Sequence, residues 1–211
     1  MDSGQAKDAL LAAILPDVPF DGWSDAVLTR AAERVGLERA ELRSLCPGGI
    51  RDLVAWFSHW ADRETMRALE ARDLSALKVR ERIATGVQTR LGVLAPHREA
   101  VRRALALLSA PQNLALGARL LYDAVDAIWY AAGDTATDFN FYTKRALLAG
   151  VYGATTLYWL DDRSPESADT LAFLDRRLGD IMAIPKATER MRAWASRLPN
   201  PFLLVRLARR R

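Results

Sequence analysis

Residues 24–57 read SDAVLTRAAERVGLERAELRSLCPGGIRDLVAWF, and this stretch carries the clearest structural signal in the chain. Apolar residues recur in it at three- and four-residue spacing, which predicts helices. The pattern is interrupted at Gly36 and again at Pro47-Gly48-Gly49, because glycine and proline favour turns over continued helix. Ser24 suits an N-cap. The stretch therefore predicts a helix, a turn, a short helix, a break and a long helix, which is the layout of a helix-turn-helix.

The same helical periodicity extends outward from this stretch through most of the 211 residues. It starts near residue 8, and no segment alternates polar and apolar residues as a strand would. We expect an all-α fold with a single helical domain over 1–198 and a separate tail over 199–211. The predicted helices lie near 7–15, 24–35, 38–45, 50–71, 79–94, 97–108, 112–132, 139–160, 166–183 and 187–197, with Pro185 separating the last two.

The charge of the N-terminal region separates two interpretations of the helix-turn-helix. One is a DNA reader, and the other is a structural corner with no role in DNA binding. Residues 1–49 contain eight acidic and five basic residues, which is a net charge of −3. A DNA-binding surface must neutralise phosphates. The charge favours the structural corner, and we expect no nucleic-acid partner.

The composition excludes several other classes of site. The chain has one cysteine, Cys46, and two histidines, His59 and His97, so we expect no disulfide framework and no metal centre. Asp123 and Asp126 form an acidic pair, but no histidine partner is expected for it. The pair is therefore only weak evidence for catalysis. Because the composition offers no metal centre and little sign of a catalytic group, we expect a protein that is not an enzyme and needs no cofactor. The acidic start of the chain lacks a targeting pattern.

Two helices around residues 133–137 suggest either close packing or a ligand cavity. In the first, Leu114, Ala118, Leu121, Val125, Ile128 and Ala132 form an apolar stripe. In the second, residues 146–160 carry no charge but are too few to span a bilayer, which predicts a central helix buried on all sides. Small residues at its middle destabilise a helix unless a backbone or a ligand comes close. Tyr152, Thr155 and Tyr158 are candidates for polar contacts. The residues predicted to bind an apolar lipid are Leu121, Val125, Ile128, Trp129, Leu147, Gly150, Val151, Gly153, Ala154 and Tyr158.

The tail, PNPFLLVRLARRR, combines apolar residues with arginines and has no acidic residue. Without it the chain would hold 26 basic and 26 acidic residues, so the net charge of +4 belongs to the tail. This composition is typical of an interfacial membrane anchor, although a C-terminal helix that packs in a dimer would also fit. The predicted membrane-contacting residues are Phe202, Leu203, Leu204, Val205, Arg206, Leu207, Arg209, Arg210 and Arg211.

The start of the helix at 139–160 has the composition of an interface anchor. Aromatic residues there stand beside an aspartate and an arginine at three- and four-residue spacing, which suits a protein-binding surface. An N-capped helix start whose aromatic side chains fold into the protein is the alternative. The predicted partner-binding residues are Asp138, Asn140, Phe141, Tyr142 and Arg145.

The motif DAVDAIWYAAGDTATDFNFYTKR at 123–145 resembles the signature of the coenzyme Q biosynthesis accessory lipid-binding protein family, the ninth member of the COQ set. The resemblance continues in VPFDGWSDAVLTRAAERVGL (18–37), LCPGGIRDLVAWF (45–57), LLSAPQN (107–113) and ALLAGVYGATTLYWLDDRSPESADTLAFLDRR (146–177). The chain departs from the family at Cys46, where phenylalanine is more common, and at Phe141, where tryptophan is.

The resemblance implies a fold similar to TetR regulators without their DNA binding, together with a lipid pocket and a membrane-associating C-terminal segment. It also implies a homodimer and a supporting role for the demethoxyubiquinone hydroxylase, to which an isoprenoid or quinone-like lipid is presented at an anionic membrane. The start of the chain looks like that of a bacterial member, which would place the protein in the cytoplasm, peripheral on the inner face of the inner membrane. A ligand-responsive TetR-type transcriptional repressor is the alternative function.

Overall fold

The computed structural model describes residues 2–133 and 139–195, with side chains described at 2–133 and 143–181. This part of the chain is helical and contains no strand, as predicted. Three-residue 3₁₀ turns precede α7, α8 and α10. The helices are α1 (Ser3–Ile14), α2 (Val18–Asp21), α3 (Asp25–Arg34), α4 (Arg39–Leu45), α5 (Ile50–Glu70), α6 (Val79–Leu94), α7 (Arg98–Leu108), α8 (Leu114–Ala131), α9 (Phe139–Asp161) and α10 (Ala168–Ala195).

Two proline positions differ from the sequence prediction. Pro185 does not separate two helices, because α10 runs through it without a break. Proline inside a helix removes one backbone donor and crowds the carbonyl four residues earlier, so it disfavours a helix without always ending it. Pro19 lies in the first turn of α2, where the missing donor costs nothing, and a short helix forms where only a break was predicted.

The predicted helix-turn-helix is confirmed as α3, α4 and the start of α5. The hydroxyl of Ser24 accepts a hydrogen bond from the backbone N–H of Val27 at 3.4 Å, so Ser24 is the N-cap of α3. Gly36, with a φ of +73°, makes the turn that follows α3. The carboxylate of Asp25 accepts from the backbone N–H of Ile50 at 2.8 Å. This bond fixes the start of α5 against the start of α3.

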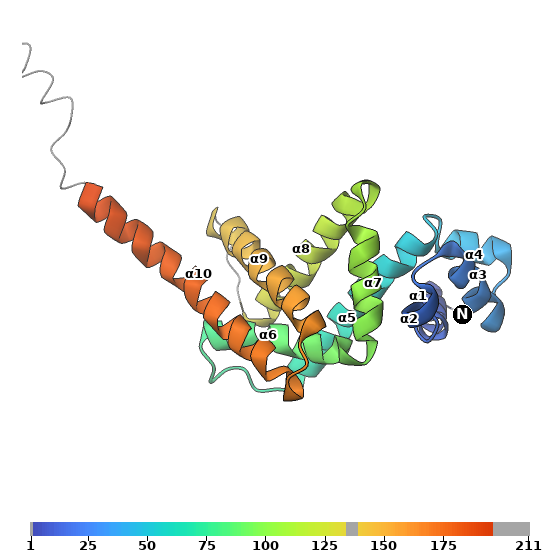
Figure 1. Ribbon diagram of the computed structural model, residues 1–211, viewed down its shortest axis with the longest axis horizontal. Coiled ribbons are helices and arrows are strands. Elements are labelled where there is room, and N and C mark those ends of the chain that lie inside the picture. The colour runs from blue at the N-terminus through green and yellow to red at the C-terminus, as the bar shows by residue number, and fades with distance from the viewer. Residues whose placement is uncertain (1, 134–138, 196–211) are drawn as a thin grey trace, which may run out of the picture.

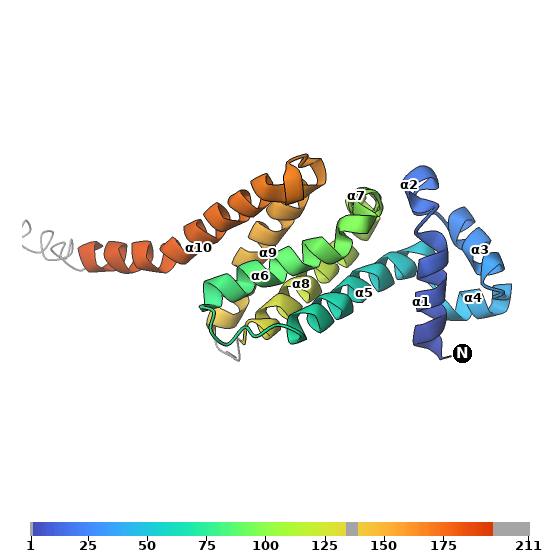
Figure 2. The same ribbon diagram turned by 90° about the horizontal axis from the view of Figure 1, so that it is seen from below.

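The helix-turn-helix lies at one end of an elongated molecule, and α10 extends from the opposite end (Figures 1 and 2). The long helix α5 passes from the N-terminal helices into a bundle with α6, α7, α8 and α9. The buried apolar side chains form one continuous core, from Leu10 and Ile14 in α1 through Leu53 in α5 to Leu174 and Leu178 in α10. The bundle is therefore held rigidly around the site described below.

A short polar turn sets the angle between α9 and α10. The carboxylate of Asp162 accepts from the backbone N–H groups of Ser164 at 2.8 Å and Thr170 at 2.9 Å, and from both of their hydroxyls. These hydrogen bonds hold the pKa of Asp162 well below its usual range, because they stabilise the charged form. Arg98 of α7 donates to the carbonyl of Asp162 at 2.7 Å and ties α7 to the same turn.

Candidate functional site

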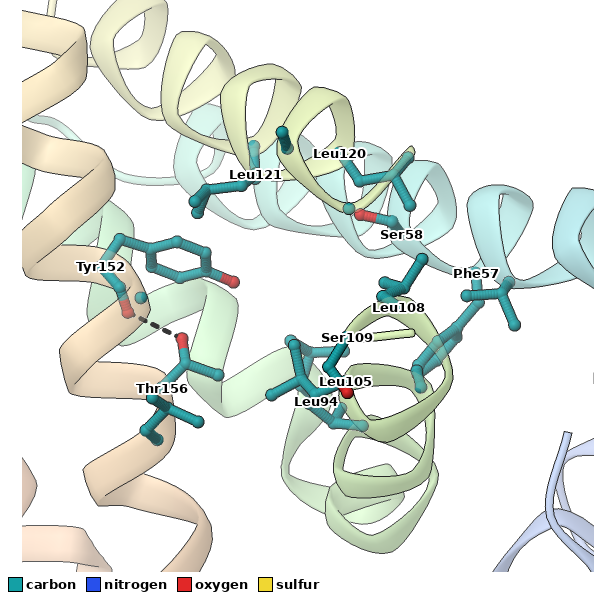
Figure 3. Close-up of a pocket in the computed structure, with 18 of the residues that line it drawn as sticks. Phe57, Ser58, Leu94, Leu105, Leu108, Ser109, Leu120, Leu121, Tyr152 and Thr156 are labelled. Atoms are coloured by element: carbon teal, nitrogen blue, oxygen red, sulfur yellow. Dashed lines mark hydrogen bonds between the residues drawn. The ribbon is translucent and has the colours of Figure 1, made fainter. Parts of the chain in front are cut away.

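An apolar cavity of about 510 Å³ lies inside the bundle, between α5, α6, α7, α8 and α9 (Figure 3). Its volume is within the range of small-molecule sites. Each helix contributes side chains at three- and four-residue spacing, which place them on one helical face. The lining residues are Val54, Phe57, Ser58, Arg90, Leu94, Val101, Ala104, Leu105, Leu108, Ser109, Leu114, Gly117, Ala118, Leu120, Leu121, Ala124, Tyr152, Gly153, Thr156 and Leu157.

One end of the cavity is polar because Arg90 of α6 reaches it from the core. Its side chain is only 4% exposed and forms an ion pair with Asp62 of α5. Its Nε donates to the hydroxyl of Tyr152 at 2.7 Å, and its Nη2 donates to the hydroxyl of Ser58 at 3.2 Å. The ring of Tyr152 points into the cavity (Figure 3).

The charge of Arg90 is stabilised by its neighbours. Burial by itself lowers the pKa of the guanidinium, but Tyr152 and Asp62 raise it above its ordinary value. Arg90 therefore stays protonated, and its N–H groups remain donors. The cavity combines apolar walls with a small, fixed cluster of hydrogen-bonding groups, an arrangement that orients a bound molecule.

The structure places the residues predicted to bind lipid in three different environments. Leu121 and Gly153 line the cavity. Leu147 is half-buried, and Val125, Ile128, Trp129 and Val151 are buried, but none of these five lines it. Gly150, Ala154 and Tyr158 are exposed on α9 and lie outside it as well. The assignment of this set to lipid binding stays a prediction.

The prediction that residues 146–160 are buried on all sides is wrong. Leu148 and Trp159 are buried, but Leu157 is 61% exposed and Tyr158 is 40% exposed, with its ring stacked on Phe173 at a centroid distance of 4.7 Å. The reason is that α9 lies at the edge of the bundle. Helices α8, α10 and, to a smaller extent, α7 pack against it, while Leu157 on its outer side stays exposed.

Sequence reasoning missed Ser58, Arg90 and the whole contribution of α7. Arg90 has no local signature, since it is one of three arginines on α6. Ser58 is 32 residues from it in the chain, and Tyr152 is 62 residues away. Tyr152 was weighed as a polar contact and does line the cavity, whereas Thr155 donates to the carbonyl of Val151 within α9.

The residues predicted to contact a protein partner are only partly described. Asp138 lies outside the described residues, and Asn140, Phe141 and Tyr142 lie on α9 with undescribed side chains. Arg145 is 3% exposed, and its Nε donates to a carboxylate oxygen of Asp126 at 2.5 Å. The predicted membrane-contacting residues, which fall within 202–211, also lie outside the described residues.

The expectation that the acidic pair has no histidine partner is wrong for Asp123. The Nε2 of His59 lies 3.5 Å from its carboxylate, and both side chains are more than one-third exposed. The sequence gives no sign of this contact, because His59 is on α5 and Asp123 is on α8. Neither residue lines the cavity.

Two arginines of α3 on the helix-turn-helix surface are paired with acids. Arg30 forms an ion pair with Asp21, and Arg34 forms one with Asp17. The side chain of Glu41 accepts the backbone N–H of Glu38 at 2.9 Å, so two carboxylates stand at the start of α4. A helix N-terminus otherwise attracts phosphate. These contacts reduce the positive charge that α3 offers to a phosphate backbone.

Over the described residues, no helix is both long and apolar enough to cross a membrane.

Comparison with known proteins identifies a family from the sequence and a fold from the structure. The COQ9 family model matches residues 114–185. The chain is 34% identical over 184 residues to the mitochondrial ubiquinone biosynthesis protein COQ9 of Rattus norvegicus and 35% identical to that of Homo sapiens. Both alignments cover 84% of this chain but only 59% and 58% of those proteins, so the chain spans slightly less than three-fifths of their length.

Among solved structures, a TetR transcriptional regulator from Nitrosomonas europaea is similar, with a TM-score of 0.67 and 22% sequence identity. The match covers 82% of this chain and 95% of the regulator. At this level of identity the likeness establishes the fold alone, which is TetR-like, as the resemblance implied.

Proposed function

Since this chain belongs to the COQ9 family of ubiquinone biosynthesis proteins, we propose that it is a non-enzymatic accessory protein that binds an isoprenoid or quinone-like lipid and presents it to the demethoxyubiquinone hydroxylase. The observation that carries the proposal is the cavity of about 510 Å³, which has apolar walls and one polar end. Such a site retains a molecule that is mostly apolar and has few polar groups.

The chemistry of the cavity supports binding without catalysis. Its lining includes no aspartate, glutamate or histidine among the residues that the structure describes. The hydroxyl of Ser58 accepts a hydrogen bond from a charged guanidinium and has no base beside it, so it is not activated as a nucleophile. The site can hold and orient a ligand, and the nearby carboxylate of Asp62 is engaged in its ion pair with Arg90.

A transcriptional repressor of the same fold is less well supported. The regulator from Nitrosomonas europaea shares the fold at 22% identity. The net charge of −3 over residues 1–49 and the ion pairs of Arg30 and Arg34 weaken any attraction to phosphates.

The test of the function is to identify the lipid that the intact protein carries and then to measure its effect on the hydroxylase. We expect organic extracts of the purified protein to contain an isoprenoid or quinone-like lipid at close to one molecule per chain. The loaded protein should bind the demethoxyubiquinone hydroxylase in a calorimetric titration. Extracts without such a lipid, or no binding of the hydroxylase by the loaded protein, would contradict the proposal.

Membrane association through residues 199–211 is a second part of the proposal. Each arginine near an anionic lipid contributes about 1 kcal/mol, so the four arginines of the segment together favour binding by several kcal/mol. We expect the intact chain to sediment with anionic vesicles, less so at high salt because charges are then screened. A chain without residues 199–211 should stay in the supernatant. Equal sedimentation of both forms would exclude the segment as the anchor and leave packing in a dimer as its role.

A further inference from the structure

The hydrogen bonds at the polar end of the cavity have a fixed direction. A guanidinium has five N–H donors and no acceptor. The hydroxyl oxygens of Tyr152 and Ser58 must therefore be the acceptors in their bonds to Arg90, at 2.7 and 3.2 Å. Each hydroxyl then has its own hydrogen left to donate.

Among the residues that the structure describes, neither hydroxyl donates a hydrogen bond to a protein group. Tyr152 is 6% exposed, so water reaches its hydroxyl poorly, and a buried donor without an acceptor is costly. The ring of Tyr152 points into the cavity (Figure 3), and Ser58 is one of the residues that line it. The acceptor that these donors need can come from a bound molecule.

The polar end lies well inside the cavity, away from the leucines that open to solvent. His59, the neighbour of Ser58, lies 3.5 Å from Asp123 on α8, which places the polar end near that level of the helix. Leu114 is nine residues earlier on α8, or about 14 Å along the axis. Leu114 is 55% exposed and Leu157 on α9 is 61% exposed, and both line the cavity. The cavity thus has a donor end inside and an apolar end at the surface.

Resting on the proposed function, we infer that the ligand enters with its polar head innermost, and that this head carries hydrogen-bond-accepting oxygens such as the carbonyls or ring ethers of a quinone. The hydroxyls of Tyr152 and Ser58 donate to these oxygens, and the apolar tail runs along α8 toward Leu114 and Leu157. A plain hydrocarbon leaves both donors unused. Presentation of the ligand to another protein or to a membrane therefore begins with its tail.

The test compares two probes of similar length in the full-length protein. One is a ubiquinone with a two-isoprene tail, and the other is an isoprenoid hydrocarbon without oxygen. Affinities are measured by displacement of a bound fluorescent probe. We expect Tyr152→Phe and Ser58→Ala each to weaken quinone binding roughly three- to tenfold, as the loss of one hydrogen bond would. Binding of the hydrocarbon should change less than about twofold.

Two features keep this test decisive. Tyr122→Phe is the control, since Tyr122 is an exposed tyrosine on α8 that does not line the cavity, and it should leave both affinities unchanged. Ser58→Ala also leaves the carbonyl of Ser58, 3.5 Å from Nη2 of Arg90, as an acceptor, so this variant should fold even if Tyr152→Phe does not.

Three results would overturn the inference. In the first, the two cavity variants bind the quinone as tightly as the parent protein does. In the second, the parent binds the hydrocarbon but not the quinone. Both of these leave the proposed lipid-binding function standing. In the third, the parent binds neither probe, and the proposed function then fails together with the inference.

Discussion

Gly153→Leu is expected to empty the cavity and reduce bound lipid at least tenfold. Gly153 lines the cavity, and a Cβ at this position meets no atom within 4 Å. A leucine side chain there begins in open space and extends into the volume that the ligand needs. Leucine is also a better helix former than glycine, so α9 should not be weakened. The lipid content of the purified variant, measured by extraction and mass spectrometry, checks this result.

Gly150→Leu provides the matched control on the same helix. Gly150 also has open space around its Cβ position, but it is exposed and does not line the cavity. Both variants thus gain the higher helix propensity of leucine and the same side chain. Only at Gly153 does that side chain lie at the cavity. Full lipid content in a folded Gly153→Leu variant would show that the lipid is bound elsewhere. Equal loss in both variants would point to an effect on α9 as a whole.

Asp62→Ala is expected to lower the free energy of unfolding by about 3 kcal/mol, because it leaves a buried charge without its partner. The side chains of Arg90 and Asp62 are 4% and 15% exposed, so water cannot replace the lost carboxylate fully. For a protein of this size, that change corresponds to a drop in melting temperature of about 6–12 °C. Thermal and urea unfolding of the two proteins measure it.

Glu64→Ala, on the same helix, is the control: it breaks an exposed ion pair, whereas Asp62→Ala breaks a buried one. Glu64 pairs with Arg67, whose side chain is 69% exposed, and exposed pairs contribute about 1 kcal/mol or less. We also expect Arg90→Met to recover part of the stability lost in Asp62→Ala, because the double variant no longer buries an unpaired charge. If Asp62→Ala proved no more costly than Glu64→Ala, the pair would not be a stabilising element of the polar end.

Local signals in the sequence predicted most of the helices and suggested a cavity between two of them. The helix-turn-helix at 24–57 could be predicted because its signals are local, namely apolar spacing, the cap at Ser24 and the turn at Gly36. The prediction of a cavity beside residues 112–132 and 146–160 also used local signals, and the structure does place a cavity along both helices. Where the local rule was only a tendency, as at Pro185, the prediction was wrong.

Only the tertiary structure decided which residues face the cavity and how polar it is. Ser58, Arg90 and Tyr152 are on three helices, and nothing in the spacing of their residues shows that a guanidinium joins two hydroxyls. An uncharged helix has the same sequence pattern whether each side meets protein or solvent, so the exposed side of α9 could not be read from residues 146–160. Helical periodicity is a property of one segment, whereas the contents of a cavity depend on how several segments pack around it.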